Sequence, residues 1–417
     1  MDSIELKKYH KQYSQELFEN CLPFWLNYSI DDVNGGIYSC LDRVGQIYST
    51  DKSVWLNGRS AWTFSHLCNQ YGIRAEWHDV AESCLNFLND YCIDRSDGRM
   101  YFSVTKDGKP LRKRRYFFSE CFYIIANAEY ALAFNDENAL YAARKYYDFI
   151  LSIYRDPSCD PYKITPKNLL YTRDCKTFSN VMILLNVTNT VKRCDPLNSM
   201  KYERISQELI DEMLNGFYNE EYGVFLENIS SDGQLFDNCS TARLVNPGHG
   251  IEGAWFILSE AIDLNNHQLV EAAANIFKST LSMGWDKEYG GLYYFRDLLG
   301  WPPEQCENNM KLWWPHTEAI IACIMLYEAT GDDYFFKEFK KLTDYAFSSF
   351  SDPEYGEWYG YLSRNGEPVL PASKGSLFKG PFHLPRMLIT VERSLDRLIK
   401  KTESVNYALQ PVGEVHS

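Results

Sequence analysis

The sequence predicts an all-α fold, an (α/α)6 barrel with short β-hairpins on one rim. Two observations carry this prediction: a turn motif that recurs along the chain, and a pair of unlike helices between successive copies of the motif. The chain has 417 residues, of which 45% are hydrophobic, and this is enough apolar material for one large core. We therefore expect a single barrel domain over residues 1–400 and a flexible tail over residues 401–417.

Five stretches share the turn motif, in which acidic or Asn residues are followed by a glycine and then by alternating aromatic residues. This pattern is typical of a short β-hairpin. The stretches lie at residues 31–47, 95–110, 219–234, 286–297 and 352–368. Their first glycines are separated by 63, 125, 67 and 66 residues, and 125 is about two periods. A degenerate sixth copy is therefore expected near residue 160, inside the stretch "PSCDPYKITPKNLLY".

Two kinds of helix are expected between the hairpins. One kind is amphipathic, as at residues 75–92, 138–154 and 268–285. The other kind is apolar on most faces, as at residues 119–134, 178–191, 250–262 and 317–329. A helix with one apolar stripe lies on the outside of a domain, whereas a helix that is apolar all round is buried. Six repeats of an outer and an inner helix would close into a toroid.

The toroid places the start of every inner helix on the same rim, because each inner helix follows a hairpin or a long loop. Residues at these starts should converge on one central funnel. They are Arg59, Glu120, His249, Glu252, His316, Glu318, His383 and Arg386. The three histidines of this set are each 67 residues apart and lie in Gly- and Pro-rich junctions. We therefore expect them at equivalent places in consecutive repeats.

Histidines and arginines around one funnel predict proton-transfer chemistry. A histidine can take or give a proton near neutral pH, so two of them on opposite sides of a substrate carbon can invert its configuration without a redox cofactor. Arg59, Arg386 and the helix N-termini would stabilise the anion formed on the way. Glu252 and Glu318 would orient an imidazole or bind substrate hydroxyl groups.

The sequence alone allows a second explanation for several of these residues. Three histidines with Glu252 or Glu318 would also suit a zinc site, although HxxE at the start of a helix is a weak metal motif and no metal is expected. A pair of carboxylates across the toroid would suit an inverting glycosidase. Trp55, Trp313 and Trp314 would offer flat faces to a sugar ring, but the Trp313–Trp314 pair equally fits core packing. Glu120 equally fits a buried partner for an arginine.

Composition excludes other classes of partner. The net charge is −14 and the pI is about 5.1, so the chain should repel nucleic acid and anionic membranes. The chain contains no GxxxxGK[ST] motif and no GxGxxG motif that opens a helix. Twelve scattered cysteines without a CxxC pair, and an N-terminus without an apolar signal core, predict a cytoplasmic protein.

Five motifs carry a resemblance to a known family. "WLNGR", "FSECFY", "NPGHGIEGAWF", "KLWWPHTEA" and "KGPFHLPR" resemble, in this order, the N-acylglucosamine 2-epimerase family over about residues 5–398. The resemblance implies an (α/α)6 barrel that interconverts N-acetylglucosamine and N-acetylmannosamine by proton transfer at C2 of the ring-opened sugar, through an enediolate. It also implies a homodimer, a place in amino-sugar and sialic acid metabolism, and a nucleotide such as ATP as an activator that is not consumed.

The motifs also assign roles by resemblance. The acid/base histidines fall on His249 and His383, the essential arginines on Arg59 and Arg386, and an assisting glutamate on Glu318. The expected substrate-binding residues are Glu252, His316, Trp313, Glu120 and Trp55. Which histidine serves which face of C2 stays open.

A related branch of the family, which acts on unacylated sugars, is the alternative to the N-acyl branch. Cellobiose 2-epimerases and aldose–ketose isomerases carry a further histidine on the third inner helix, whereas the segment 178–191 contains none. Those enzymes also lack the "NPGH" opening and the Pro-His of "WWPHTEA". The N-acyl branch is therefore favoured. A 2-epimerase or aldose–ketose isomerase for an unacylated sugar, and a non-catalytic binding homologue, remain the alternatives.

Overall fold

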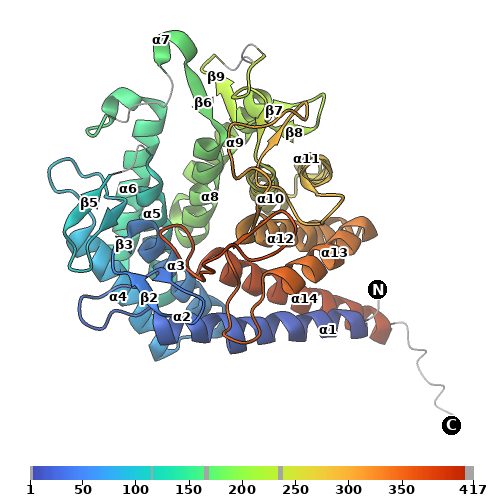
Figure 1. Ribbon diagram of the computed structural model, residues 1–417, viewed down its shortest axis with the longest axis horizontal. Helices are drawn as coiled ribbons and strands as arrows, with labels where there is room; N and C mark the ends of the chain where they lie inside the picture. The colour runs from blue at the N-terminus through green and yellow to red at the C-terminus, as the bar shows by residue number, and fades with distance from the viewer. Residues whose placement is uncertain (1–2, 114–115, 164–168, 233–237, 409–417) are drawn as a thin grey trace.

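Six helices form a closed inner ring in the computed structural model, which describes residues 3–113, 116–163, 169–232 and 238–408 (Figure 1). They are α3 (Val54–Tyr71), α5 (Phe118–Phe134), α8 (Phe178–Cys194), α10 (Pro247–Asp263), α12 (Trp313–Thr330) and α14 (His383–Ala408). Each helix packs against the next one in this order, and α14 returns to α3 to close the ring.

A second helix covers each inner helix from outside. The pairs are α4 (Ala75–Tyr91) on α3, α6 (Glu137–Arg155) on α5, α9 (Ser199–Glu212) on α8, α11 (His267–Gly284) on α10, α13 (Asp333–Ser349) on α12, and α1 (Ser3–Gln15) on α14. The first helix of the chain thus completes the last repeat, and Figure 1 shows α1 beside α14. The predicted (α/α)6 barrel is confirmed.

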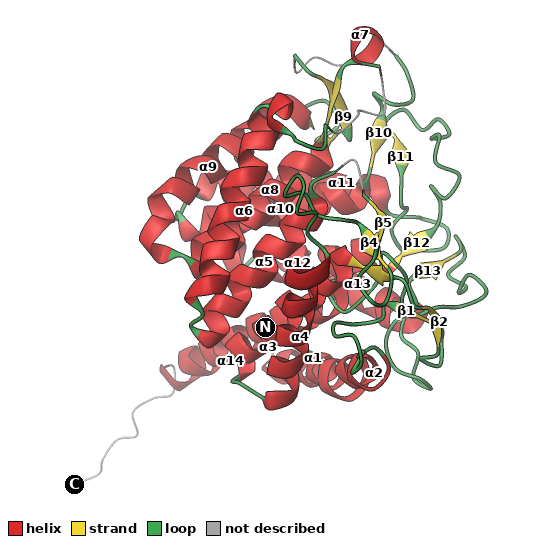
Figure 2. Cartoon of the chain, turned by 90° about the vertical axis from the view of Figure 1, so that its left-hand side faces the viewer, coloured by secondary structure: helices red, strands yellow, loops and turns green. Residues whose placement is uncertain are grey.

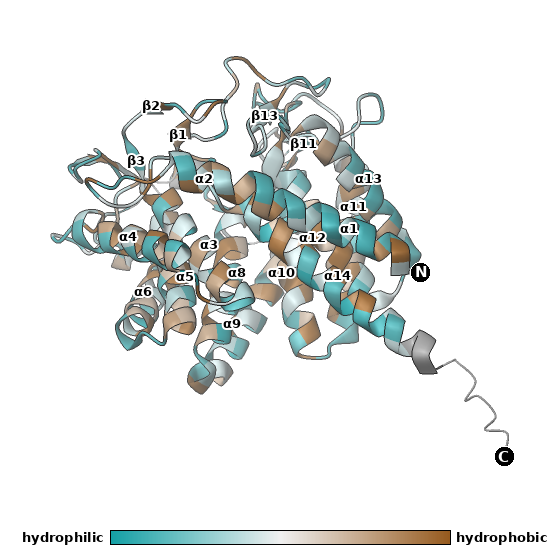
Figure 3. Cartoon of the chain, turned by 90° about the horizontal axis from the view of Figure 1, so that it is seen from below, coloured by the Kyte–Doolittle hydropathy of each residue, from teal (hydrophilic) through white to brown (hydrophobic). Residues whose placement is uncertain are grey.

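Burial separates the two layers as the sequence pattern predicted. Every residue of α12 from Trp313 to Ile324 is buried. Its partner α13 instead buries one stripe, which comprises Phe335, Phe336, Phe339, Leu342 and Ala346 among others. Hydrophilic residues dominate the outward surface of α1 (Figure 3). The core therefore lies between the rings and is shaped by the inner helices.

The strands gather on one rim of the barrel (Figure 2). They are β1 (Cys40–Leu41), β2 (Ile47–Ser49), β3 (Lys52–Ser53), β4 (Ser103–Val104), β5 (Pro110–Arg112), β6 (Cys175–Thr177), β7 (Tyr218–Asn219), β8 (Val224–Phe225), β9 (Asn228–Ser230), β10 (Leu244–Val245), β11 (Arg296–Asp297), β12 (Lys311–Leu312) and β13 (Tyr361–Leu362). Shorter helical segments are α2 (Leu22–Tyr28), α7 (Leu170–Arg173), η1 (Glu16–Cys21), η2 (Pro157–Cys159), η3 (Pro196–Asn198) and η4 (Met213–Phe217).

All five glycine motifs form the same tight turn. Each turn closes with an antiparallel bridge between residues seven apart, as in Ile30–Ile37 and Trp285–Leu292. The first glycine of each motif has a positive φ, which glycine adopts without steric cost. Near residue 160, by contrast, η2 and a turn replace the sixth copy, and residues 164–168 lie outside the described residues.

The sequence did not predict that strands also pair between successive repeats. The antiparallel pairs β3–β4, β6–β9, β10–β11 and β12–β13 each join the strand before an inner helix to a strand of the next repeat. These strands have two or three residues, so none would be stable as an isolated hairpin. The belt they form ties the starts of the inner helices together.

Buried ion pairs fix the glycine turns against the inner helices. Asp31 bonds to Lys52 at 2.6 Å and Asp286 to Lys311 at 3.0 Å, and both lysines lie two residues before the start of an inner helix. Asp352 and Lys374 repeat the arrangement at 3.0 Å. Removing one partner of a buried pair leaves an uncompensated charge and costs roughly 3–5 kcal/mol. The ion pairs of the rim therefore hold in place the residues at the N-termini of the inner helices.

The end of the chain differs in detail from the expected boundary at residue 400. Helix α14 runs through this point to Ala408, and the rest of the expected tail, residues 409–417, lies outside the described residues. None of the described helices combines the length and the apolar composition that a bilayer crossing needs.

Candidate active site

A cavity of about 420 Å³ opens at the rim end of the ring. Its volume is within the range of small-molecule sites. Every inner helix contributes to its wall: Trp55 and Arg59 come from α3, Phe118 and Phe122 from α5, Met182, Ile183 and Asn186 from α8, His249 and Glu252 from α10, Trp313 and Trp314 from α12, and His383 and Arg386 from α14. The remaining wall residues are Tyr294, Glu307, Met310, Leu312, Tyr361, Phe378 and Phe382.

His249 is held by the cap of its own helix. Asn246 is the N-cap of α10, and its side chain accepts a hydrogen bond from the His249 backbone N–H at 3.2 Å. Pro247 occupies the first helical position, which suits its fixed φ. The stretch Asn-Pro-Gly, which was expected as a loop junction, is thus the cap and first turn of α10. This turn directs the third helical residue, His249, into the cavity.

Each of two histidines forms a dyad with a carboxylate. Nδ1 of His249 lies 2.8 Å from Oε1 of Glu227, and Nδ1 of His383 lies 2.8 Å from Oε1 of Glu318. Because the carboxylate is an acceptor, Nδ1 carries the proton in both rings. Nε2 of each ring has no hydrogen-bond partner among the described residues, so it is left for a substrate. Both rings contact the indole of Trp314, with centroids 5.3 and 5.9 Å apart.

Arg386 joins the carboxylates on one side of the cavity. Its buried guanidinium lies 2.8 Å from Glu252 and 2.7 Å from Glu318, through the same nitrogen. Burial opposes the charge, but Glu318 and then Glu252 outweigh it and raise the pKa of Arg386. The carboxylate that orients His383 is therefore neutralised by a cation.

Arg59 is the contrasting cation. It forms no ion pair with a described residue, and its guanidinium lies over the rings of Phe122 and Phe382 at 4.1 and 5.0 Å. Its Nε is buried without a hydrogen-bond partner. Burial lowers the pKa of Arg59 to about 9, so the group stays charged at neutral pH. A charged guanidinium without a carboxylate, in a cavity wall, is suited to bind a developing anion.

The two dyads give their histidines opposite acid–base properties. Burial alone would lower the pKa of His249, but Glu227 and then Glu252 outweigh it and raise that pKa. Burial, Arg59 and Arg386 together hold the pKa of His383 well below its usual range. The difference has a visible cause: Arg386 neutralises Glu318, whereas no described cation bonds to Glu227. A pair whose environments separate its pKa values is the pattern of one acid and one base.

The expected site residues Trp55, Glu252 and Trp313 do line the cavity. Trp55 donates its indole N–H to Ser119 at 3.0 Å, which leaves its ring face for the cavity wall. Trp313 and Trp314 are buried as well as lining the cavity, so they belong to both the core and the site.

His316 does not face the cavity, and this corrects the expectation that it binds substrate. Its Nε2 accepts a hydrogen bond from the Leu292 backbone N–H at 2.8 Å, and its Nδ1 lies 2.6 Å from the Leu312 carbonyl oxygen. The ring stacks on Tyr345 of the outer helix α13. Burial lowers the pKa of His316 to about 3, so this histidine is a neutral part of the core.

Glu120 is also a core residue and not a substrate ligand. Its carboxylate is fully buried and accepts hydrogen bonds from Arg99 Nε at 2.7 Å and from the Met100 backbone N–H at 2.8 Å. The same guanidinium reaches Asp160 at 2.5 Å. The alternative considered for this residue, a buried partner for an arginine, is the one that the structure contains.

The geometry also excludes a site of three histidines around a zinc ion, because both ring nitrogens of His316 are bonded to the backbone away from the cavity. Donor atoms of Glu252, Glu318 and His383 do lie within 4.8 Å of one another. The guanidinium of Arg386 already lies against both carboxylates and supplies the positive charge there.

Glu227 is a residue of the candidate site that the sequence pattern did not indicate. It follows the buried stretch Val224–Leu226 in the hairpin after β7, where an ionisable residue is unexpected. That position is the one signal in the sequence that would have drawn attention to it. Its pairing with His249 depends on how the hairpin docks on α10, which the sequence pattern does not specify.

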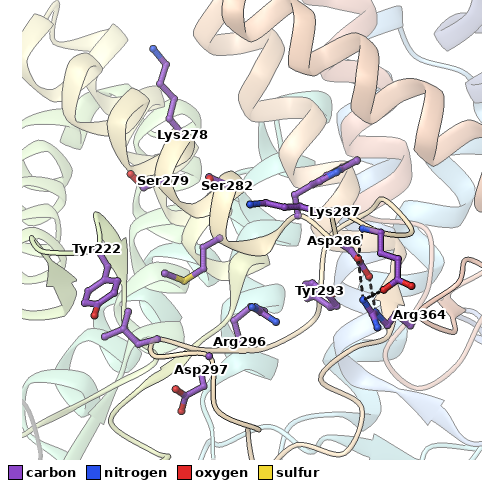
Figure 4. Close-up of a pocket in the computed structure, with 15 residues that line it drawn as sticks. Tyr222, Lys278, Ser279, Ser282, Asp286, Lys287, Tyr293, Arg296, Asp297 and Arg364 are labelled. Carbon is purple, nitrogen blue, oxygen red and sulfur yellow. Dashed lines mark hydrogen bonds and ion pairs between the residues drawn. The ribbon is translucent and has the colours of Figure 1, made fainter.

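A larger hollow of about 790 Å³ on the rim shares no lining residue with this cavity. Figure 4 shows its lining residues, among which Asp286 and Arg364 lie against each other at the right-hand side of the view. Asp286 also bonds to Lys311, and Asp297 bonds to Arg243. These charges belong to the ion pairs that hold the rim, and no histidine lines this hollow. The smaller cavity is therefore the candidate active site.

Comparisons with known proteins identify the family and the fold. The family model described as N-acylglucosamine 2-epimerase matches residues 36–379. The N-acylglucosamine 2-epimerase of Bos taurus is 35% identical over 95% of this chain and 93% of its own length, and the cellobiose 2-epimerase of Bacteroides fragilis is 24% identical over 91% and 97%. The solved cellobiose 2-epimerase of Spirochaeta thermophila superposes with a TM-score of 0.81 at 21% identity, over 95% of this chain and 98% of that one. The chain therefore belongs to the N-acylglucosamine 2-epimerase family.

Proposed function

We propose that this protein is an N-acylglucosamine 2-epimerase that interconverts N-acetyl-D-glucosamine and N-acetyl-D-mannosamine at C2 of the open-chain sugar. The observation that carries the proposal is the pair of dyads, His249–Glu227 and His383–Glu318, on one cavity. Family membership and the mammalian relatives support the substrate class.

The opposite pKa shifts define a proton path. Neutral His383 accepts the C2 proton through Nε2, the C2–H electron pair forms a C1=C2 bond, and the C1 carbonyl oxygen becomes an enolate oxygen. Imidazolium His249 then delivers a proton to the other face of C2, and the C1 carbonyl re-forms. The configuration at C2 is inverted, and no electrons are lost or gained. For the opposite epimer the two histidines exchange roles, and exchange with water restores the starting protonation.

Arg59 is assigned to the enolate oxygen, because it is the cavity cation without a carboxylate partner among the described residues. Its apolar surroundings strengthen an electrostatic interaction relative to water. Arg386 instead holds Glu318 and Glu252 in place.

The two other classes of function fit the cavity less well. An inverting glycosidase needs one carboxylic acid and one carboxylate on opposite sides of the sugar. Here Glu252 and Glu318 converge on a single guanidinium, so they do not stand on opposite sides of a substrate. A non-catalytic binding protein would have no use for two imidazoles with free Nε2 atoms and separated pKa values.

The proposal is tested by proton NMR of N-acetylmannosamine with the protein in D2O. We expect N-acetylglucosamine signals to grow and deuterium to enter C2 of the product. Added EDTA should not change the rate, because the site supplies its positive charges from arginines. Formation of a ketose, or turnover of mannose but not of N-acetylmannosamine, would assign the enzyme to the unacylated-sugar branch. A protein inert towards both sugars would favour the binding homologue.

Glu227 gives the enzyme a predicted pH dependence. Replacing Glu227 with Gln removes the charge that raises the pKa of His249, so that pKa should fall. In the direction in which imidazolium His249 donates the proton, activity is lost as the pH rises through this pKa. The basic limb of the kcat/KM profile should therefore move to lower pH in Glu227→Gln. The opposite epimer needs neutral His249, so the acidic limb of its kcat/KM profile should extend to lower pH in the same variant. If neither profile shifts, Glu227 does not control the pKa of His249 and the proposed dyad is wrong.

Further properties are proposed on the resemblance to the family. We propose that the enzyme acts in the cytoplasm as a homodimer, in amino-sugar and sialic acid metabolism, on a sugar alone and without nucleic acid or a membrane. No cofactor is proposed to be consumed. A nucleotide such as ATP is proposed as an activator, and a non-hydrolysable analogue should then raise the rate as ATP does.

A further inference from the structure

We propose that Asn186 of α8 recognises the acylamino group of the substrate, and that Met182 and Ile183 receive its methyl end. The proposal rests on the proposed function, which places an acylamino group on C2, the carbon between the two histidines. According to this proposal, side chains of α8 determine whether the enzyme prefers a sugar with an acylamino group or one with a hydroxyl group at C2.

Helix α8 stands across the cavity from one of the catalytic histidines. The inner ring runs α3, α5, α8, α10, α12 and α14, so α8 and α14 are three positions apart in a ring of six. From α8, only Met182, Ile183 and Asn186 line the cavity. Asn186 lies four residues after Met182 and three residues after Ile183, so it neighbours both side chains on the helix surface. That face is opposite His383 and adjacent to α10, which carries His249.

Asn186 offers the chemistry that an acylamino group needs. It is the only side-chain amide among the residues that line the cavity, and it is half-buried. Its amide forms no hydrogen bond with a described residue, so both its donor and its acceptor are left for a ligand. An acylamino group presents one N–H and one carbonyl oxygen, and a carboxamide can pair with both.

The rest of the α8 face is apolar and suits the acyl methyl group. Met182 and Ile183 are buried, with 4% and 9% of their surfaces exposed. A hydroxyl group at C2 of an unacylated sugar could pair with Asn186 but has no apolar end to bury against these two side chains, so its complex lacks the burial energy that the methyl group gains. Glu252, a charged residue of the cavity wall, is meanwhile held by Arg386. The face therefore favours the larger, half-apolar substituent.

The test compares two linear polyols, 2-acetamido-2-deoxymannitol and mannitol, by calorimetry. They resemble the open-chain sugars but cannot react. Wild type should bind the acetamido polyol more tightly. In Asn186→Leu, which keeps the size but removes the amide, this preference should narrow roughly ten- to hundred-fold, and kcat/KM for N-acetylmannosamine should fall by a similar factor. Asn186→Ala serves the same purpose if the leucine variant does not fold.

The matched control is Asn189→Leu. This is the same chemical change one turn along α8, outside the cavity, where the amide donates a hydrogen bond to the Phe256 carbonyl oxygen at 3.2 Å. It should not alter the preference between the two polyols. In addition, Met182→Ala should raise kcat/KM for an N-butanoyl sugar relative to the N-acetyl sugar.

The outcomes separate this proposal from the proposed function. If wild type does not epimerise N-acetylmannosamine, the proposed function fails. If wild type is active but Asn186→Leu weakens the binding of both polyols equally, or of neither, Asn186 does not recognise the acylamino group. An unchanged preference for acyl length in Met182→Ala would overturn the role given to the apolar face.

Discussion

Replacing His383 with asparagine should lower kcat for epimerisation by roughly 10²–10⁴-fold, the usual contribution of a general acid or base. The asparagine amide can still donate to Glu318, as Nδ1 of the ring does, but it has no group to take the place of Nε2. His249→Asn should cause a comparable loss for the same reason. The measurement is the initial rate of N-acetylmannosamine conversion by NMR.

The two variants should differ in hydrogen exchange at C2. With His383 replaced, His249 can still remove and return the proton of the epimer whose C2–H faces it, so this epimer should gain deuterium without inversion. With His249 replaced, the other epimer should do so. If both variants exchange the same epimer, the two histidines do not serve opposite faces of C2 and the mechanism is wrong.

His316→Asn is the matched control for both variants. It is the same substitution in the third member of the 67-residue series, but the ring lies outside the cavity. The loss of its two backbone contacts should reduce stability. Turnover per folded molecule should be retained, and a loss as large as that of His383→Asn would mean that the cavity does not define the active site.

Arg59→Met and Arg386→Met should have different effects, although both remove one guanidinium from the cavity. Arg59→Met should lower kcat roughly 10²–10³-fold, the usual effect of removing one group that stabilises a developing anion. Its effect on stability should be within about 1 kcal/mol, because no described carboxylate loses its partner. Turnover and thermal unfolding of the same preparations provide the measurement.

Arg386→Met leaves Glu252 and Glu318 without their shared cation. An unpaired buried charge costs roughly 3–5 kcal/mol, so the melting temperature should fall clearly. The pKa of His383 should rise, because Arg386 lowers it and Glu318 is no longer neutralised. If instead Arg59→Met is the variant that unfolds, the division between an anion-binding arginine and a structural arginine is wrong.

The fold could be predicted from sequence because two simple signals repeat. The glycine turns at 35, 98, 223, 290 and 356 all adopt a positive φ, and the apolar pattern separates buried α12 from striped α13. Both signals are local to the turn or the helix. The pairing of strands between repeats, as in β10–β11, was not predictable because strands of two residues carry no pattern.

The candidate site was predicted in part. Spacing places His249, His316 and His383 at the starts of successive inner helices, and all three are there. They are, however, the third, fourth and first residues of their helices. Each residue turns the side chain by about 100°, so equal spacing along the chain does not give equal directions. His316 consequently packs against the outer layer.

The sequence by itself determined the ring of helices, the rim on which function is built, and the histidines and arginines at that rim. The tertiary structure alone decided which of them meet. It paired Glu227 with His249, gave Arg386 to Glu318, and left Arg59 without a carboxylate among the described residues. The physical reason is that the pattern of apolar residues fixes which face of a helix is buried, whereas the partner and pKa of a buried charge depend on a few ångströms of packing between distant segments.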